Sequence, residues 1–60
     1  MNIKLQSKRK KMGLTQVEVA EKARVSGRAY QQYESGERVP RADTAKLIAK
    51  ALNSTVEELF

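Results

Sequence analysis

The sequence predicts an all-α fold, a compact bundle of five short helices formed by one domain over residues 1–60. Turn and capping signals recur about every ten residues, and apolar residues at helical spacing follow each of them. No segment shows the alternation of apolar and polar residues that a half-buried strand requires. The chain contains no Cys and no His, so packing must stabilise it in place of disulfides or a Cys/His zinc site.

A glycine and a capping box delimit the first two helices. We expect the first helix over residues 3–12, with Gly13 ending it in the left-handed conformation. Thr15 and Glu18 have the spacing at which each side chain hydrogen-bonds the backbone N–H of the other, which predicts a second helix over residues 16–23. The inward face of this helix is small, so another helix can approach closely; its residues are Val19, Ala20 and Ala23.

Ser26 is the expected cap of a third helix, over residues 27–35, which Gly36 ends. Only about three residues separate it from the second helix, and this spacing is that of a helix-turn-helix. Tyr30 and Tyr33 are expected to face the core, since aromatic residues at this spacing pack inward more often than they stack on bases. The polar residues left on the exposed face are Arg28, Gln31 and Gln32.

The last two helices complete the core. The fourth is expected over residues 42–52, with Asn53 ending it in the left-handed conformation. Its expected core residues are Leu47, Ile48, Ala51 and Leu52. Either Ser54 or Thr55 caps a short fifth helix, because each has a Glu three residues further on. The residues expected to finish the core are Leu59 and Phe60.

The positive charge is concentrated towards the N-terminus. Residues 1–41 hold ten basic and four acidic side chains, net +6, whereas residues 42–60 hold two basic and three acidic ones, net −1. A basic surface is typical of proteins that bind a polyanion, although a solvated helix face that maintains solubility has the same composition. Nucleic acid is a better candidate than a membrane surface, because the apolar side of the first helix is thin.

Several classes of protein are disfavoured. A chain of this length buries only about 60% of its unfolded surface, which leaves little room for a catalytic cavity. No catalytic constellation is present, so we expect no enzyme. Without Cys or His we expect no metal site, and the sequence indicates no cofactor and no small-molecule ligand. The longest apolar run, residues 47–49, is far short of the roughly 20 residues that span a membrane, so we expect a cytoplasmic protein without a membrane partner.

Five motifs along the chain carry a resemblance to a known family. They are G-L-T-Q-x-E-x-A over residues 13–20, V-S at residues 25–26, Y-E-x-G over residues 33–36, Pro40, and I-A-x-A-L over residues 48–52. In this order and spacing the chain resembles the lambda-repressor-like (XRE) helix-turn-helix family of phage repressors and Cro proteins over almost its whole length. The resemblance implies a five-helix bundle whose second and third helices bind DNA, with the third in the major groove.

The resemblance assigns base contacts to the third helix. Gly27, Arg28 and Gln32 occupy the family's main base-reading positions. An Arg can bind O6 and N7 of guanine through two hydrogen bonds, and a Gln can bind N6 and N7 of adenine. Gly27 has no side chain and contributes close approach only, so direct reading falls to Arg28, Gln32 and Gln31.

Other positions match residues that contact the DNA backbone or stabilise the domain. Gln16 is similar to the family's Gln that contacts a phosphate and braces the recognition helix, and its N–H lies at a positive helix end. Arg41 matches an Arg that enters the minor groove or holds a phosphate. Arg9 and Glu34 match a pair that forms a buried salt bridge between the first and third helices. The remaining expected backbone contacts are Thr15, Ser26, Lys10 and Arg38.

Four residues depart from the family's pattern. Arg24 stands in the turn where the family usually has Gly, at a position that favours positive φ, which costs about 1 kcal/mol or more in backbone strain. Tyr30 replaces an aliphatic core residue, Ala45 a Leu, and Ser54 a Val. These changes reshape the core near the fourth and fifth helices. We therefore expect low to moderate stability and weaker support for the family's dimer contacts, which commonly come from its C-terminal region.

These observations predict a sequence-specific, double-stranded DNA-binding transcriptional regulator, a repressor of phage, mobile-element or bacterial origin. One copy reads few base pairs, so we expect a homodimer on a pseudo-palindrome with half-sites about 10 base pairs apart. The chain is expected to be either a minimal Cro-like regulator or the N-terminal part of a longer repressor. The alternative is a helix-turn-helix module for protein interaction, as in an antitoxin or a co-regulator, which the basic N-terminal part and Arg28 disfavour.

Overall fold

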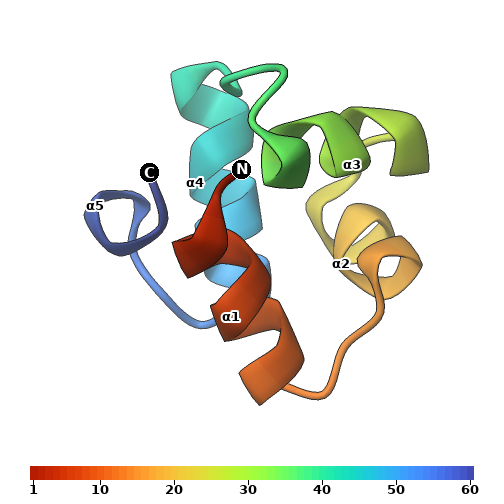
Figure 1. The fold of residues 1–60 in the computed structure, drawn as a ribbon, viewed down its shortest axis with the longest axis vertical. Coiled ribbons are helices and arrows are strands. Elements are labelled where there is room, and N and C mark those ends of the chain that lie inside the picture. The colour runs from red at the N-terminus through yellow and green to blue at the C-terminus, as the bar shows by residue number, and fades with distance from the viewer.

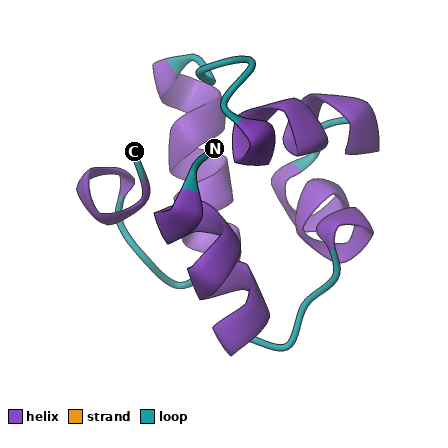
Figure 2. Cartoon of the chain, in the orientation of Figure 1, coloured by secondary structure: helices purple, strands orange, loops and turns teal.

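Five helices follow one another along the chain in the computed structural model, which describes residues 1–60. They are α1 (Ile3–Lys11), α2 (Gln16–Ala23), α3 (Gly27–Ser35), α4 (Ala42–Ala51) and α5 (Val56–Leu59). There are no strands (Figure 2). The all-α prediction is therefore confirmed. The helix ends predicted for α1 to α4 lie within one residue of the observed ones.

The caps predicted for α2 and α3 are present. The Thr15 side chain accepts a hydrogen bond from the Glu18 N–H, and the Glu18 carboxylate accepts one from the Thr15 N–H, which is the predicted capping box. Ser26 accepts a hydrogen bond from the Ala29 N–H and so begins α3. Because these contacts join residues three apart, the sequence alone is enough to predict them.

The structure also resolves the start of α5 and adds a cap at α1. Thr55 caps α5, since its hydroxyl oxygen accepts a hydrogen bond from the Glu58 N–H. Ser54 belongs to the end of α4, where the Ser54 backbone N–H donates to the Ala49 carbonyl. Asn2 caps α1 by accepting from the Leu5 N–H. The sequence reasoning missed this cap, although Asn before a helix is a recognised signal.

Residues in the left-handed conformation follow α1 to α4. They are Gly13 (φ 72°), Arg24 (φ 60°), Gly36 (φ 85°) and Asn53 (φ 53°). Gly36 has a second reason to be glycine, because a Cβ at this position would lie 2.9 Å from the backbone nitrogen of Met1. The close approach of the N-terminus to the end of α3 therefore depends on the missing side chain.

The core lies where the small face of α2 meets α3 and α4. In Figure 1, α4 lies behind α1, with α2 and α3 on one side of them and α5 on the other. The buried cluster takes residues from every helix and the turn after α4; its members are Leu5, Val19, Ala20, Ala23, Tyr30, Tyr33, Ile48, Ala49, Leu52 and Leu59. None of the helices has the length and hydropathy needed to cross a bilayer.

Two predictions of buried core residues, Leu47 and Phe60, are wrong. Leu47 is 43% exposed. The residues of α4 that face the core follow one another at intervals of three or four, and Leu47 lies next to this buried face rather than on it. The residues of the buried face are Ala45, Ile48, Ala49 and Leu52. Phe60 is 40% exposed, since it follows the single buried residue of the short helix α5, Leu59. Ala51, also expected in the core, is only half-buried.

Candidate nucleic-acid interface

Helices α2 and α3 form a helix-turn-helix. The turn is made by Arg24, Val25 and Ser26, and it closes when the Val25 N–H donates to the Ala20 carbonyl at 3.0 Å. Because Arg24 has φ 60° and ψ 39°, its backbone supplies the left-handed step that a Gly would supply more easily. The chain then leaves the turn at Ser26 and enters α3 directly.

Helix α3 divides into a buried and an exposed face. Tyr30, Tyr33 and Glu34 are buried, whereas Arg28 and Gln31 are exposed and Gln32 is half-buried. Gly27 lies at the start of α3 with open space around the position of a Cβ. The helix therefore needs no glycine there for its own packing, and the bare backbone leaves room for a close approach.

The exposed face of α3 borders a shallow hollow with only polar side chains. It is lined by Gln16, Arg28, Gln31, Gln32, Ser35 and Glu37. The hollow gathers the predicted base-reading side chains beside Gln16 of α2, which comes from a different helix. A surface of donors and acceptors without apolar walls fits the polar edges of bases and phosphates better than an apolar small molecule.

A nearly buried ion pair holds α3 against α1. Arg9 Nε lies 2.6 Å from Glu34 Oε2, and the two side chains are 12% and 4% exposed. Arg9 also donates to the Leu14 carbonyl at 2.9 Å, so it fixes the α1–α2 connection as well. This is the pair that the resemblance implied. Arg9 is thus part of the interior, although it belongs to a basic run in the sequence.

Gln16 joins this ion pair from α2. Its Nε2 donates to Glu34 Oε1 at 3.2 Å, so the carboxylate of α3 receives hydrogen bonds from two other helices. Burial acts to raise the pKa of Glu34, but the hydrogen bonds, chiefly those from Arg9, outweigh it and hold the pKa below its ordinary value. The bracing role implied for Gln16 has this geometric counterpart.

The predicted phosphate contacts at the helix starts are partly engaged within the protein. The Thr15 N–H is already bonded to Glu18, and the hydroxyl oxygens of Thr15 and Ser26 accept their own capping hydrogen bonds. Each hydroxyl proton and the Gln16 N–H remain available as donors. The hydrogen bond from Thr15 lowers the pKa of Glu18, so a carboxylate stands at the start of α2.

The loop between α3 and α4 carries two arginines in different settings. Arg38 donates from Nη1 to Gln32 Oε1 at 3.3 Å, and its guanidinium lies 5.8 Å from the centroid of the Tyr33 ring. Both arginines are exposed, and Arg41 has its Nε 3.9 Å from Asp43 Oδ1. Arg38 is therefore tied to the recognition helix, and the sequence offered no signal for that contact.

Three of the four lysines of α1 lie on the side of α5, and the fourth lies apart from them. Lys4, Lys8 and Lys11 line a hollow together with Ser54, Glu58 and Leu59 at the α5 end of the chain, away from the polar hollow of α3. Lys10 is exposed outside both hollows. The basic run in the sequence is thus split by the helical geometry among the core, the α5 side and open solvent.

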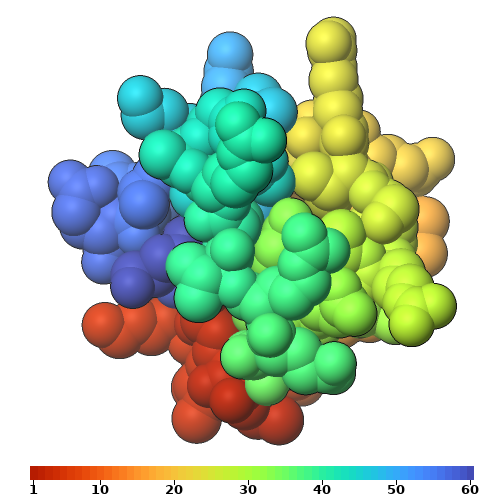
Figure 3. Space-filling view, turned by 90° about the horizontal axis from the view of Figure 1, so that it is seen from above, coloured from red at the N-terminus to blue at the C-terminus, as the bar shows by residue number.

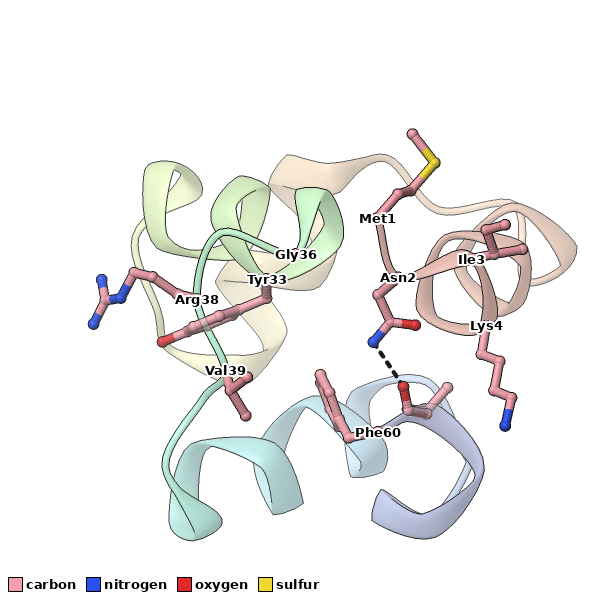
Figure 4. A pocket seen from close by; sticks show the side chains of 10 residues that line it. Met1, Asn2, Ile3, Lys4, Tyr33, Gly36, Arg38, Val39 and Phe60 are labelled. Atoms are coloured by element: carbon pink, nitrogen blue, oxygen red, sulfur yellow. Dashed lines mark hydrogen bonds between the residues drawn. The ribbon is translucent and has the colours of Figure 1, made fainter.

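An apolar groove opens where the N-terminus, the α3–α4 loop and α5 meet (Figure 3). Its exposed apolar side chains come from these three segments and are Met1, Ile3, Val39 and Phe60. Figure 4 shows Tyr33, Val39 and Phe60 around one space, with the hydrogen bond from Asn2 to the Leu59 carbonyl at its side. Lys4 and Arg38 also line the groove.

The fold and the interface define a helix-turn-helix protein with a polar recognition helix. The chain belongs to the helix-turn-helix family HTH_3, the lambda-repressor-like (XRE) class, which matches residues 5–59. This class consists of DNA-binding regulators. Comparisons with curated proteins and with solved structures found no match to this chain.

Proposed function

We propose that residues 1–60 form one domain that binds double-stranded DNA sequence-specifically and acts as a transcriptional repressor of phage, mobile-element or bacterial origin. The observation that carries this proposal is the polar exposed face of α3, held from behind by Arg9, Glu34 and Gln16. A recognition helix fixed in this way loses little conformational freedom when it enters a major groove. Such a regulator works where the DNA is, in the cytoplasm of a bacterial cell.

The side chains divide into readers of bases and contacts to the backbone. Arg28 is suited to O6 and N7 of a guanine, Gln31 and Gln32 to neighbouring base edges, and Gly27 to close approach. The proposed phosphate contacts are Gln16, Thr15, Ser26, Arg41, Lys10 and Arg38. Through the phosphate itself, contacts of this second kind set the position and the salt dependence of binding without choosing the sequence.

We propose that a second copy of the chain covers the apolar groove on the operator. The groove is lined in part by the basic residues Lys4 and Arg38, and the adjoining helix α5 exposes Glu57 and Glu58. A two-fold symmetric pair would set the basic side of each copy against the acidic helix of the other, with apolar side chains covered between them. The groove adjoins the end of α3, so a pair of copies joined here would hold the two α3 helices near each other.

Selection from a random double-stranded DNA pool at about 150 mM salt tests the central proposal, because this salt suppresses purely electrostatic binding. We expect enrichment of a two-fold symmetric motif with half-sites about 10 base pairs apart. Failure to enrich any motif would contradict the proposal and favour a module for protein interaction.

Arg28→Ala and Lys10→Ala test the division between reading and positioning. Arg28→Ala should weaken binding to the selected site by about 1 to 3 kcal/mol and relax the preference at one base pair. Lys10→Ala should weaken binding to all DNA alike and reduce the salt slope by about 1. Equal effects of both variants on selected and random DNA would contradict the assignment.

Val39→Glu tests the dimer, with Leu47→Glu as the matched control. Both residues are exposed and apolar, and the two variants change the net charge equally, but only Val39 lines the groove. In titrations, Val39→Glu should abolish cooperative binding to DNA with two half-sites while keeping affinity for a single half-site. Leu47→Glu should keep the cooperativity. Unchanged cooperativity in Val39→Glu would exclude the groove as the dimer contact.

A further inference from the structure

We propose that Arg38 is a positioning residue that makes Gln32 select guanine over adenine. The inference rests on the proposed function, since it concerns one base pair within the proposed operator. It also changes the expectation for Gln32, whose side chain could otherwise bind adenine through both ends of its amide.

Arg38 is exposed, and three contacts hold it next to Gln32. The Arg38 N–H donates to the Gln32 carbonyl at 3.3 Å, so the loop returns onto the last turns of α3. The guanidinium lies 5.8 Å from the centre of the Tyr33 ring, which is buried and provides a rigid platform. From this place Nη1 donates to Gln32 Oε1 at 3.3 Å.

The contact distinguishes the two ends of the Gln32 amide. A guanidinium has only donors, so it can hold the oxygen end and must leave the nitrogen end free. No group of the protein accepts a hydrogen bond from Gln32 Nε2. Arg38 therefore engages the acceptor end of the Gln32 amide, and the end left without a protein partner is a donor.

A free donor end suits guanine. In the major groove, guanine presents two neighbouring acceptors, N7 and O6, whereas adenine presents the acceptor N7 beside the N6 donor. Binding adenine through two hydrogen bonds requires the amide oxygen as well as the nitrogen. Arg38 occupies one of the two lone pairs of the amide oxygen and restrains the amide, so the oxygen is a poorer acceptor for adenine N6, whereas the free Nε2 keeps its match to guanine.

The test compares Arg38→Met with Arg41→Met. Methionine keeps the length and apolar character of the arginine stem but has no N–H donor. Arg41 is a matched control, because it is exposed in the same loop and makes no contact with Gln32. Gln32→Ala first identifies the base pair that depends on Gln32. Binding of each variant is then measured on a single half-site carrying guanine or adenine at that position, so that the place of Arg38 in the groove does not affect the comparison.

We expect the unmodified protein to bind the guanine site about tenfold more tightly than the adenine site. Arg38→Met should lower both affinities through the lost phosphate contact and should also remove this preference or reverse it. Arg41→Met should lower both affinities together and keep the preference. A guanine preference unchanged in Arg38→Met, or an adenine preference in the unmodified protein, would overturn the inference while leaving the proposed function intact. Absence of any selected site would overturn both.

Discussion

Tyr30 presents an unusual feature at the scale of single residues: its side chain is fully buried, and its hydroxyl makes no hydrogen bond. The hydroxyl lies near Glu34 and Arg9, yet without the geometry of a bond to either. Burial raises the pKa of Tyr30 strongly, and the Glu34 carboxylate raises it further, so the group stays neutral. A buried hydroxyl without a partner costs free energy, because its hydrogen bonds to water are not replaced.

Tyr30→Phe should therefore stabilise the protein, by about 1 kcal/mol, since it removes the unpartnered hydroxyl and keeps the packed ring. Urea unfolding of the two proteins measures the difference. A loss of stability in Tyr30→Phe would mean that the hydroxyl donates to Glu34 in solution.

Glu34 differs from Tyr30, because its buried carboxylate accepts hydrogen bonds from Arg9 and Gln16. Glu34→Gln removes the charge that pairs with Arg9 and should destabilise the fold by about 3 kcal/mol. For a domain of this size the melting temperature should fall by roughly 10–20 °C. Glu57→Gln, a control at an exposed carboxylate, should change stability by less than about 0.5 kcal/mol.

Stability should also fall in acid through Glu34. Its pKa in the folded protein lies below the ordinary 4.5, so its contribution is fully present above 4.5 and is lost as the pH falls through the folded value. Urea midpoints measured from about pH 6 down to about pH 2 should decline less for Glu34→Gln than for the unmodified protein. Parallel curves would show that Glu34 has no depressed pKa.

Local signals account for most features at the scale of elements. Capping boxes and left-handed residues act between neighbours three to six positions apart, so the sequence is sufficient to predict the helix ends. The buried face of α4 was predicted less well, because Leu47 and Ile48 are equally apolar and only the packing against α2 chooses between them.

The turn between α2 and α3 is an element that carries strain. Arg24 adopts φ 60° and its side chain borders a hollow with Lys22 and Lys50. Arg24→Gly should be more stable than Arg24→Ala by about 1 kcal/mol, because glycine enters the left-handed region without steric cost. The Ala variant is the comparator because it removes the same charge near the two lysines. Thermal unfolding monitored by circular dichroism measures both, and equal stabilities would show that the turn is unstrained.

The small core limits the stability of the whole molecule. The buried cluster has ten residues, three of them alanine, and no disulfide reinforces it. A chain of this length gains little net free energy from burial after the entropy of folding is subtracted.

We therefore expect a melting temperature below about 80 °C. Calorimetry measures it, and a higher value would show that the small residues on α2 and α4 pack more favourably than their size suggests. The measurement is made at low protein concentration, because association with a second copy would raise the apparent value.

The sequence by itself determined the five helices, the caps of α2 and α3 and the helix-turn-helix, because these depend on neighbouring residues along the chain. The pairing of Arg9 with Glu34 came from the family resemblance, since nothing local links residues 25 positions apart. Only the tertiary structure decided that the α1 lysines divide among different surfaces, that an apolar groove joins both ends of the chain, and that Arg38 holds Gln32. These features depend on how the helices rotate and where the α3–α4 loop returns, and packing of the whole chain sets both.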